Sequence, residues 1–90
     1  MRIPDYTTQF KRDFKKIEAR GKPMKKMEEA MRFLLTEALL PESYRDHSLK
    51  GAWKHYRELH LEPDWLLVYK IVGDTVVFSR TGTHADIFNE

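Results

Sequence analysis

Histidine is the side chain in this sequence best suited to chemistry, with four copies among 90 residues. Two of them, His60 and His84, are accompanied by Asp64 in a Pro-Asp pair and by Arg80 at the end of an alternating apolar segment. Histidine transfers protons near neutral pH and arginine binds phosphate. Cleavage of RNA by its own 2′-hydroxyl fits this set, because it needs a base, a cation beside the phosphate and an acid for the leaving oxygen.

Other reactions fit the sequence less well. A metal ion bound by His60, Asp64 and His84 would have a mixed nitrogen and oxygen ligand set, but their spacing matches no standard metal motif. The chain has no cysteine, which excludes a thiolate zinc site and a cysteine nucleophile. No glycine-rich phosphate loop and no serine in a hydrolase motif occurs. We therefore expect no metal and no cofactor, although a lone histidine is more often structural than catalytic.

The elements that would position these residues are strands. β-favouring or alternating segments follow one another at residues 53–61, 65–72 and 75–81. Pro63-Asp64 and Gly73-Asp74 predict tight turns between them, so the three strands should form an antiparallel meander. Residues 3–7 are a candidate for a further strand at its edge.

The meander should gather the polar residues at one edge of the sheet. His60 and Asp64 flank the turn between the first two strands. The third strand begins at the opposite edge, so it returns Arg80 and then His84 to the edge where His60 and Asp64 lie. The topology alone therefore predicts that these four residues converge.

Apolar residues at helical spacing predict two helices in the first half of the chain. The pattern from Phe10 to Ile17 indicates an amphipathic helix over residues 8–20, and a methionine-rich stripe predicts a second helix over residues 24–40. The Gly-Lys-Pro sequence at residues 21–23 predicts a tight turn that makes the two helices an antiparallel hairpin. The expected fold class is α+β, with the hairpin packed on one face of a small antiparallel sheet.

Two irregular segments complete the chain. The loop at residues 41–52 is long for so small a domain, and such loops are usually functional or disordered. The Thr-His-Ala-Asp sequence at residues 83–86 predicts a capping box and a short C-terminal helical turn, which places His84 and Phe88 on one face. Trp65 and Phe88 are candidates to stack on RNA bases, with burial in the core as the alternative.

Length and composition predict a single domain over residues 1–90. Ten of the 16 lysine and arginine residues precede residue 33, where only five acidic residues accompany them. A basic half favours a polyanionic partner, although solvated helix faces are often basic without one. Since no apolar segment is long enough to span a bilayer and the N-terminus lacks the apolar core of a signal peptide, we expect a cytoplasmic protein with no membrane partner.

A resemblance to a known family is carried by motifs between residues 44 and 88. These motifs are Asp46–Lys54 (DHSLKGAWK), Tyr56-Arg57, His60, Glu62–Trp65 (EPDW), Arg80–His84 (RTGTH) and Phe88. Together they closely resemble the YafQ branch of the RelE/ParE toxin superfamily. The resemblance covers the whole chain in length and in element order, whereas the helical hairpin matches only in pattern.

The resemblance implies the RelE-like microbial RNase fold and the toxin of a type II toxin–antitoxin system. Members of the branch enter the ribosomal A site and inhibit translation by cutting mRNA, without a metal, through attack by the 2′-hydroxyl. The implied partners are the 70S ribosome, mRNA and a DinJ-like antitoxin. Operator DNA would be contacted only indirectly, through the antitoxin.

The resemblance also implies a set of site residues. The acid–base residues would be His47, His60, Asp64 and His84, and the RNA- or phosphate-binding residues would be Trp65, Arg80 and Phe88. His47 enters through the resemblance alone. Within this set, we assign the general acid to His84 and the handling of the 2′-hydroxyl to Asp64 with His60. His47 and Arg80 would then contact the scissile phosphate.

The basic residues of the helical hairpin have a separate predicted role. The topology does not bring them to the catalytic edge, so we expect them to contact ribosomal RNA rather than the scissile mRNA. This basic face comprises Lys11, Arg12, Lys15, Lys16, Lys22, Lys25 and Lys26. Two rival readings of the chain stay open: a non-enzymatic toxin of the ParE kind, which acts on DNA gyrase, and an RNA-binding module in which the histidines are incidental.

Overall fold

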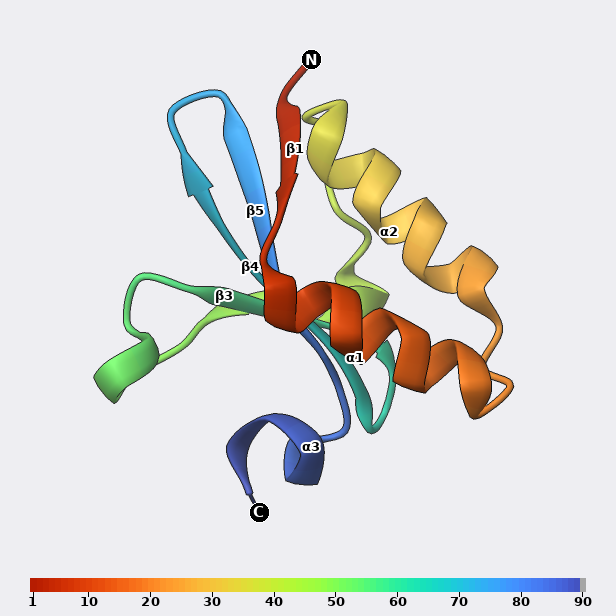
Figure 1. Cartoon of the computed structure of the whole chain (residues 1–90). Coiled ribbons are helices and arrows are strands. Elements are labelled where there is room, and N and C mark those ends of the chain that lie inside the picture. The colour runs from red at the N-terminus through yellow and green to blue at the C-terminus, as the bar shows by residue number, and fades with distance from the viewer. Residues whose placement is uncertain (90) are drawn as a thin grey trace.

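The computed structural model describes residues 1–89 as three helices beside a five-stranded sheet (Figure 1). In chain order the elements are β1 (Ile3–Tyr6), α1 (Thr8–Ala19), α2 (Met24–Leu35), β2 (His47–Ser48), β3 (Arg57–Glu62), β4 (Trp65–Val72), β5 (Thr75–Gly82) and α3 (His84–Phe88). Short 3₁₀ turns at Glu42–Tyr44 and Gly51–Trp53 flank β2. The α+β class predicted from the sequence is confirmed.

The sheet has the strand order β1-β5-β4-β3-β2. Strands β3, β4 and β5 form the predicted antiparallel meander. The N-terminal strand β1 joins its edge as expected but runs parallel to β5, with Ile3 beside Thr75, so the sheet is mixed rather than wholly antiparallel. Side-chain alternation identifies the two faces of a strand but not the direction in which it pairs, so the sequence could not distinguish these arrangements.

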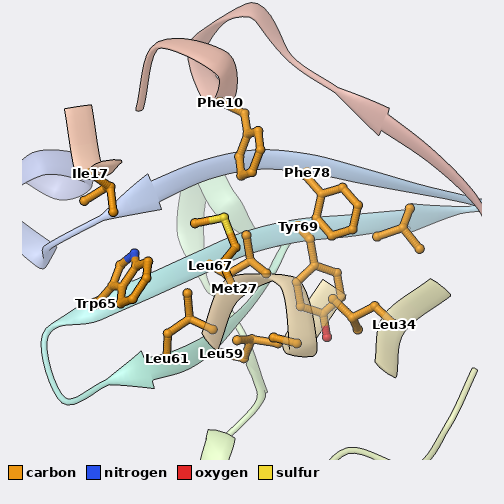
Figure 2. Close-up of a cluster of buried hydrophobic side chains, with 12 residues drawn as sticks. Phe10, Ile17, Met27, Leu34, Leu59, Leu61, Trp65, Leu67, Tyr69 and Phe78 are labelled. Atoms are coloured by element: carbon orange, nitrogen blue, oxygen red, sulfur yellow. The ribbon is translucent and has the colours of Figure 1, made fainter. Parts of the chain in front are cut away.

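The helical hairpin covers one face of the sheet and forms the main core with it (Figure 2). Phe10 and Ile17 of α1 pack there with Met27 of α2, and Met27 is fully buried. The methionine stripe is therefore core packing, as its helical spacing suggested. Gly21 turns the chain between the helices with a φ of 80°, in the left-handed region that glycine tolerates.

A smaller apolar cluster lies on the opposite face of the sheet, where the loop before β3 and helix α3 meet. Leu66, Val68 and Ile87 are its buried members, and Trp53 and Phe88 pack against them. Because period-2 alternation sends neighbouring residues of a strand to opposite faces, β4 contributes to both clusters. This second face carries the candidate site.

Two predicted boundaries were wrong. Helix α2 ends at Leu35 rather than at residue 40, because Glu37 adopts a left-handed φ of 59° and Ala38 donates to the carbonyl of Phe33, which closes the helix end. Strand β3 begins at Arg57 rather than at residue 53, because the preceding residues form a helical turn. Among residues 1–89, no helix is both long and apolar enough to cross a membrane.

Candidate active site

Three histidines from three different elements lie in a row on the second face of the sheet. The ring centroids of His47 on β2 and His60 on β3 are 5.8 Å apart, and those of His60 and His84 on α3 are 6.2 Å apart. Register explains the first pair, because antiparallel pairing sets His47 opposite Glu58, two residues from His60 on the same face. The His60–His84 proximity that the topology predicted is present, and His47 completes the row.

A buried carboxylate lies between two of these histidines. Glu58 is only 4% exposed. Its Oε2 lies 3.2 Å from Nε2 of His47 and 3.8 Å from Nε2 of His60. The sequence interpretation did not select Glu58, although the alternation of β3 places it on the same face as His60 and offered the signal.

Backbone carbonyls determine which nitrogens face this carboxylate. His47 Nδ1 lies 2.9 Å from the carbonyl oxygen of Arg45, and His60 Nδ1 lies 3.3 Å from that of Tyr44. A carbonyl can only accept, so each Nδ1 carries the hydrogen and donates it. The Nε2 atom of each ring is then directed at Glu58.

The loop that carries His47 is anchored through its neighbour Asp46. Asp46 accepts a hydrogen bond of 2.7 Å from Arg57 Nε and another from the Tyr69 hydroxyl. Burial and the adjacent Asp46 carboxylate raise the pKa of Tyr69 well above its usual value, so the phenol remains a donor at physiological pH. The anchor therefore fixes the loop against β3 and β4.

Asp64 orients the third histidine. Its Oδ1 accepts from the His84 backbone N–H at 2.9 Å and lies 2.7 Å from His84 Nδ1. These two hydrogen bonds lower the pKa of Asp64, so it is ionised near neutral pH. The pairing differs from the expected one: Asp64 contacts His84, whereas His60 contacts Glu58. With Nδ1 donating to Asp64, Nε2 is the atom through which His84 can exchange a proton with a substrate.

Side-chain hydrogen bonds stabilise the first turn of the short helix α3, which begins at His84. The predicted capping box is present, with reciprocal hydrogen bonds between Thr83 and Asp86. Arg20, which directly follows α1, binds Asp86 through two nitrogens at 2.6 and 3.0 Å. Its hydrogen bond is the main reason that the pKa of Asp86 falls below the usual range. The helical hairpin thus supports the position of His84 from across the sheet edge.

Arg80 reaches the same region but is already paired. Its Nε lies 2.7 Å from Oδ2 of the buried Asp13 on α1, and an Nη atom lies 3.3 Å from the Asp86 carbonyl. The register sets Arg80 opposite Val68 and His60 opposite Leu66, so Arg80 and His60 share a face but lie two strands apart. Arg80 is therefore at the rim of the histidine row rather than within it.

The two aromatic candidates have different environments. Trp65 is 1% exposed, packs in the main core under the helical hairpin and donates from Nε1 to Thr81 Oγ1 at 3.0 Å. Its predicted stacking on RNA is inconsistent with this position, because β4 alternation turns Trp65 away from the site face. Phe88 is half-buried and lies 5.6 Å from Trp53 and 6.5 Å from His84, centroid to centroid.

A groove runs between these aromatic rings and the acid–base residues. It is lined by Leu49, Lys50, Trp53, Glu58, His84 and Phe88. Lys50 and Trp53 were not selected as site residues from the sequence, although Lys50 lies in the long loop at residues 41–52 and Trp53 directly follows it. The groove combines a cation, aromatic rings, a buried carboxylate and a histidine that is hydrogen-bonded to an aspartate. Groups of these types can bind a phosphodiester and transfer protons to and from it.

Comparison with known proteins finds matches over almost the whole chain. The family model described as "Bacterial toxin of type II toxin-antitoxin system, YafQ" matches residues 2–89. The chain is 45% identical over 85 residues to the mRNA interferase toxin YafQ of Escherichia coli K12, which covers 93% of this chain and 92% of that protein.

Solved structures share the fold. The E. coli DinJ–YafQ complex contains a chain with a TM-score of 0.91 at 43% identity, covering 98% of this chain and 99% of that one. A metal-bound toxin from Helicobacter pylori gives a TM-score of 0.92 at 37% identity, covering 98% of this chain and 100% of that one. The chain therefore belongs to the YafQ family of bacterial type II toxin–antitoxin toxins.

Proposed function

We propose that this toxin is a ribosome-dependent endoribonuclease that cuts mRNA. The observation that carries the proposal is the pairing of two acid–base units across one groove: Glu58 between two histidines, and His84 held by Asp64. The E. coli relative is named an mRNA interferase, which supports this assignment. A toxin of the ParE kind that only binds its target has no need for either unit.

The proposed chemical step is an attack by the 2′-hydroxyl on the adjacent phosphorus. Both nitrogens of His60 face protein acceptors. Because His60 therefore has no free nitrogen for the substrate, we assign to Glu58 the acceptance of the proton from the 2′-hydroxyl. The O2′–P bond forms, the P–O5′ bond breaks, and His84 gives its proton to the departing O5′. Asp64 stabilises the imidazolium form of His84 beforehand. The products are a 2′,3′-cyclic phosphate and a 5′-hydroxyl.

Phosphate and base contacts would come from the rest of the groove. Lys50 and the pair of His47 and His60 would supply positive charge for the transition state. Arg80 would add a further positive charge at the rim if its guanidinium group partly leaves Asp13. Phe88 and Trp53, which are half-buried and line the groove, would stack on a base. We assign no metal ion to the chemical step, because the two acid–base units suffice for both proton transfers.

The proposed partners are the 70S ribosome with its mRNA and a DinJ-like antitoxin. The antitoxin assignment rests on the solved E. coli complex of DinJ with YafQ. Binding to operator DNA would be indirect, through the antitoxin. We further propose that the protein acts in the cytoplasm, where ribosomes translate.

Primer extension on mRNA in a purified translation system tests the proposal. Addition of the toxin should produce new 5′ ends at defined codons, and end-group analysis should find 2′,3′-cyclic phosphate or 3′-phosphate on the upstream fragment. Translation arrest without new ends would identify a binding toxin instead. A 3′-hydroxyl product would contradict attack by the 2′-hydroxyl, since it requires water to cleave the other bond.

The basic face of the hairpin divides into paired and unpaired residues. Lys22 and Lys26 both bind Glu62, at 2.8 and 3.0 Å, and Lys16 lies 3.5 Å from Asp86. These three lysines therefore contribute to the structure as well as to the surface charge. Within residues 1–89, the members without an ion pair are Lys11, Arg12, Lys15 and Lys25, and all four are exposed.

Reversal of three unpaired charges should weaken ribosome binding. We expect the triple variant K11E/K15E/K25E to bind ribosomes less tightly, with a shallower dependence of log affinity on log salt, because each lost phosphate contact removes about 0.7–0.9 from that slope. Cleavage at saturating toxin should change little. Sedimentation with ribosomes over a salt series measures binding, and the charge-preserving variant K11R/K15R/K25R is the matched control. Normal binding with slow cleavage would place this face in the active site instead.

A further inference from the structure

His47 lies at the edge of the sheet, on a strand too short to hold it. Strand β2 has only two residues and is the last strand of the sheet, beside β3. The His47 side chain is 50% exposed, so burial does not fix the ring either. Its Nε2 nevertheless lies 3.2 Å from Oε2 of Glu58, a separation that a small movement of the loop would break. The position of His47 therefore depends on what holds its neighbours in the chain.

Arg57 of β3 binds both neighbours of His47. Its Nε donates to Oδ1 of Asp46 at 2.7 Å, and one Nη atom donates to the hydroxyl of Ser48 at 2.8 Å. A guanidinium group suits this bridge, because its planar fork directs several N–H groups in fixed directions. A lysine ammonium is a compact point charge on a flexible stem and does not reproduce that geometry. Arg57 therefore fixes the chain on each side of His47.

Asp46 also connects this loop to the main core. Its Oδ2 accepts from the hydroxyl of Tyr69, which is 1% exposed and packs under the helical hairpin (Figure 2). Asp46 and His47 are consecutive, but Asp46 contacts Tyr69 of the core whereas His47 contacts Glu58 of the groove. The buried Tyr69 ring is held by its packing, so its hydroxyl is a fixed partner for the loop. Contacts on the core face thus determine where His47 lies on the site face.

We propose that Asp46, Arg57 and Tyr69 are positioning residues that hold His47 against Glu58 from the opposite face of the sheet. They are not among the residues that line the groove, so they would act through His47 rather than on the RNA. Resting on the proposed function, the same contacts would keep the positive charge of His47 beside the reacting phosphate. Loss of any of them should therefore slow cleavage only as long as His47 is present.

A double-mutant cycle with His47 tests the proposal. D46N should lower the single-turnover rate of mRNA cleavage on programmed ribosomes by up to about 10²-fold, the cost of a misplacement of about 1 Å. R57K should also lower the rate. Neither change should lower it further in the H47A background, because both act through the missing ring. The control D74N changes an exposed aspartate in the turn between β4 and β5 and should leave the rate unchanged. Equal losses from D46N with and without His47 would overturn the proposal.

The variant Y69F carries the same test with a smaller change. It keeps the buried ring and removes only the hydroxyl that donates to Asp46, so it decides the question if D46N does not fold. Its loss of rate should be smaller than that of D46N and should again require His47. The matched control is Y6F, which removes a hydroxyl from β1 at the other edge of the sheet. Equal losses in Y69F and Y6F would contradict a specific role for Tyr69.

A measurement without RNA separates this inference from the proposed function. The ring nitrogen chemical shifts of a histidine distinguish its tautomers, and those of His47 should report a ring whose Nδ1 donates to the Arg45 carbonyl. In D46N and Y69F the His47 signals should shift, while those of His84 stay as in the wild type. Unchanged His47 signals in D46N would overturn the proposal. If the wild-type toxin does not cut RNA, the proposed function fails, while these spectra still decide whether the three residues position His47.

Discussion

Replacement of His84 by alanine is expected to lower the single-turnover rate of mRNA cleavage by about 10²–10⁴-fold, the typical contribution of one proton-transfer group. The fold should be unaffected, because the His84 side chain is 38% exposed and its backbone N–H, which remains in the variant, still donates to Asp64. Cleavage is measured with a fixed mRNA on programmed ribosomes. The melting temperature is measured in parallel.

The companion variant D64N separates the role of His84 from that of its partner. It keeps the imidazole but removes the charge that stabilises the imidazolium, so the rate should fall less than in H84A. A rate near the wild-type value in H84A, with an unchanged melting temperature, would exclude His84 as the acid. A loss in D64N that exceeds the loss in H84A would show that Asp64 acts on the substrate itself.

Glu58→Gln is expected to cause a loss of comparable size, about 10²–10⁴-fold, in the same assay. The amide has nearly the shape of the carboxylate but cannot accept the proton from the 2′-hydroxyl.

The matched control for this variant is E62Q, on the same strand. Glu62 pairs with Lys22 and Lys26 and is not among the residues that line the groove, so E62Q should retain cleavage. Retention of activity in E58Q would transfer the role of base to one of the histidines. Equal losses in E58Q and E62Q would indicate that charge on β3 matters only for stability or docking.

Local patterns were sufficient for most of the architecture. Helical spacing from Phe10 to Ile17 identified α1 and its buried face, and the turn pairs before Trp65 and Thr75 identified the meander. The capping box at residues 83–86 placed His84 at a helix start. These features succeed because each depends on residues a few positions apart, where the backbone geometry of a helix, strand or turn determines which side chains share a face.

The arrangement of the site could be predicted only in part from the sequence. The topology brought His60, Asp64 and His84 to one edge, since hairpin connections leave little freedom in where a strand ends. It did not show that Asp64 binds His84 rather than His60, because both histidines lie at the same edge of the sheet. Nor did it show that Glu58 lies between two histidines, because His47 reaches it from a two-residue strand inside a loop with no regular pattern.

The sequence by itself thus determined the α+β class, the hairpin core and the edge at which the chemistry gathers. Only the tertiary structure decided that β1 runs parallel to β5, that Trp65 belongs to the core while Trp53 faces the groove, and that Arg80 is held by Asp13. The physical reason is the range of the interactions. Periodicity and turn chemistry act between near neighbours in the chain, whereas each of these outcomes depends on a partner supplied by a distant segment.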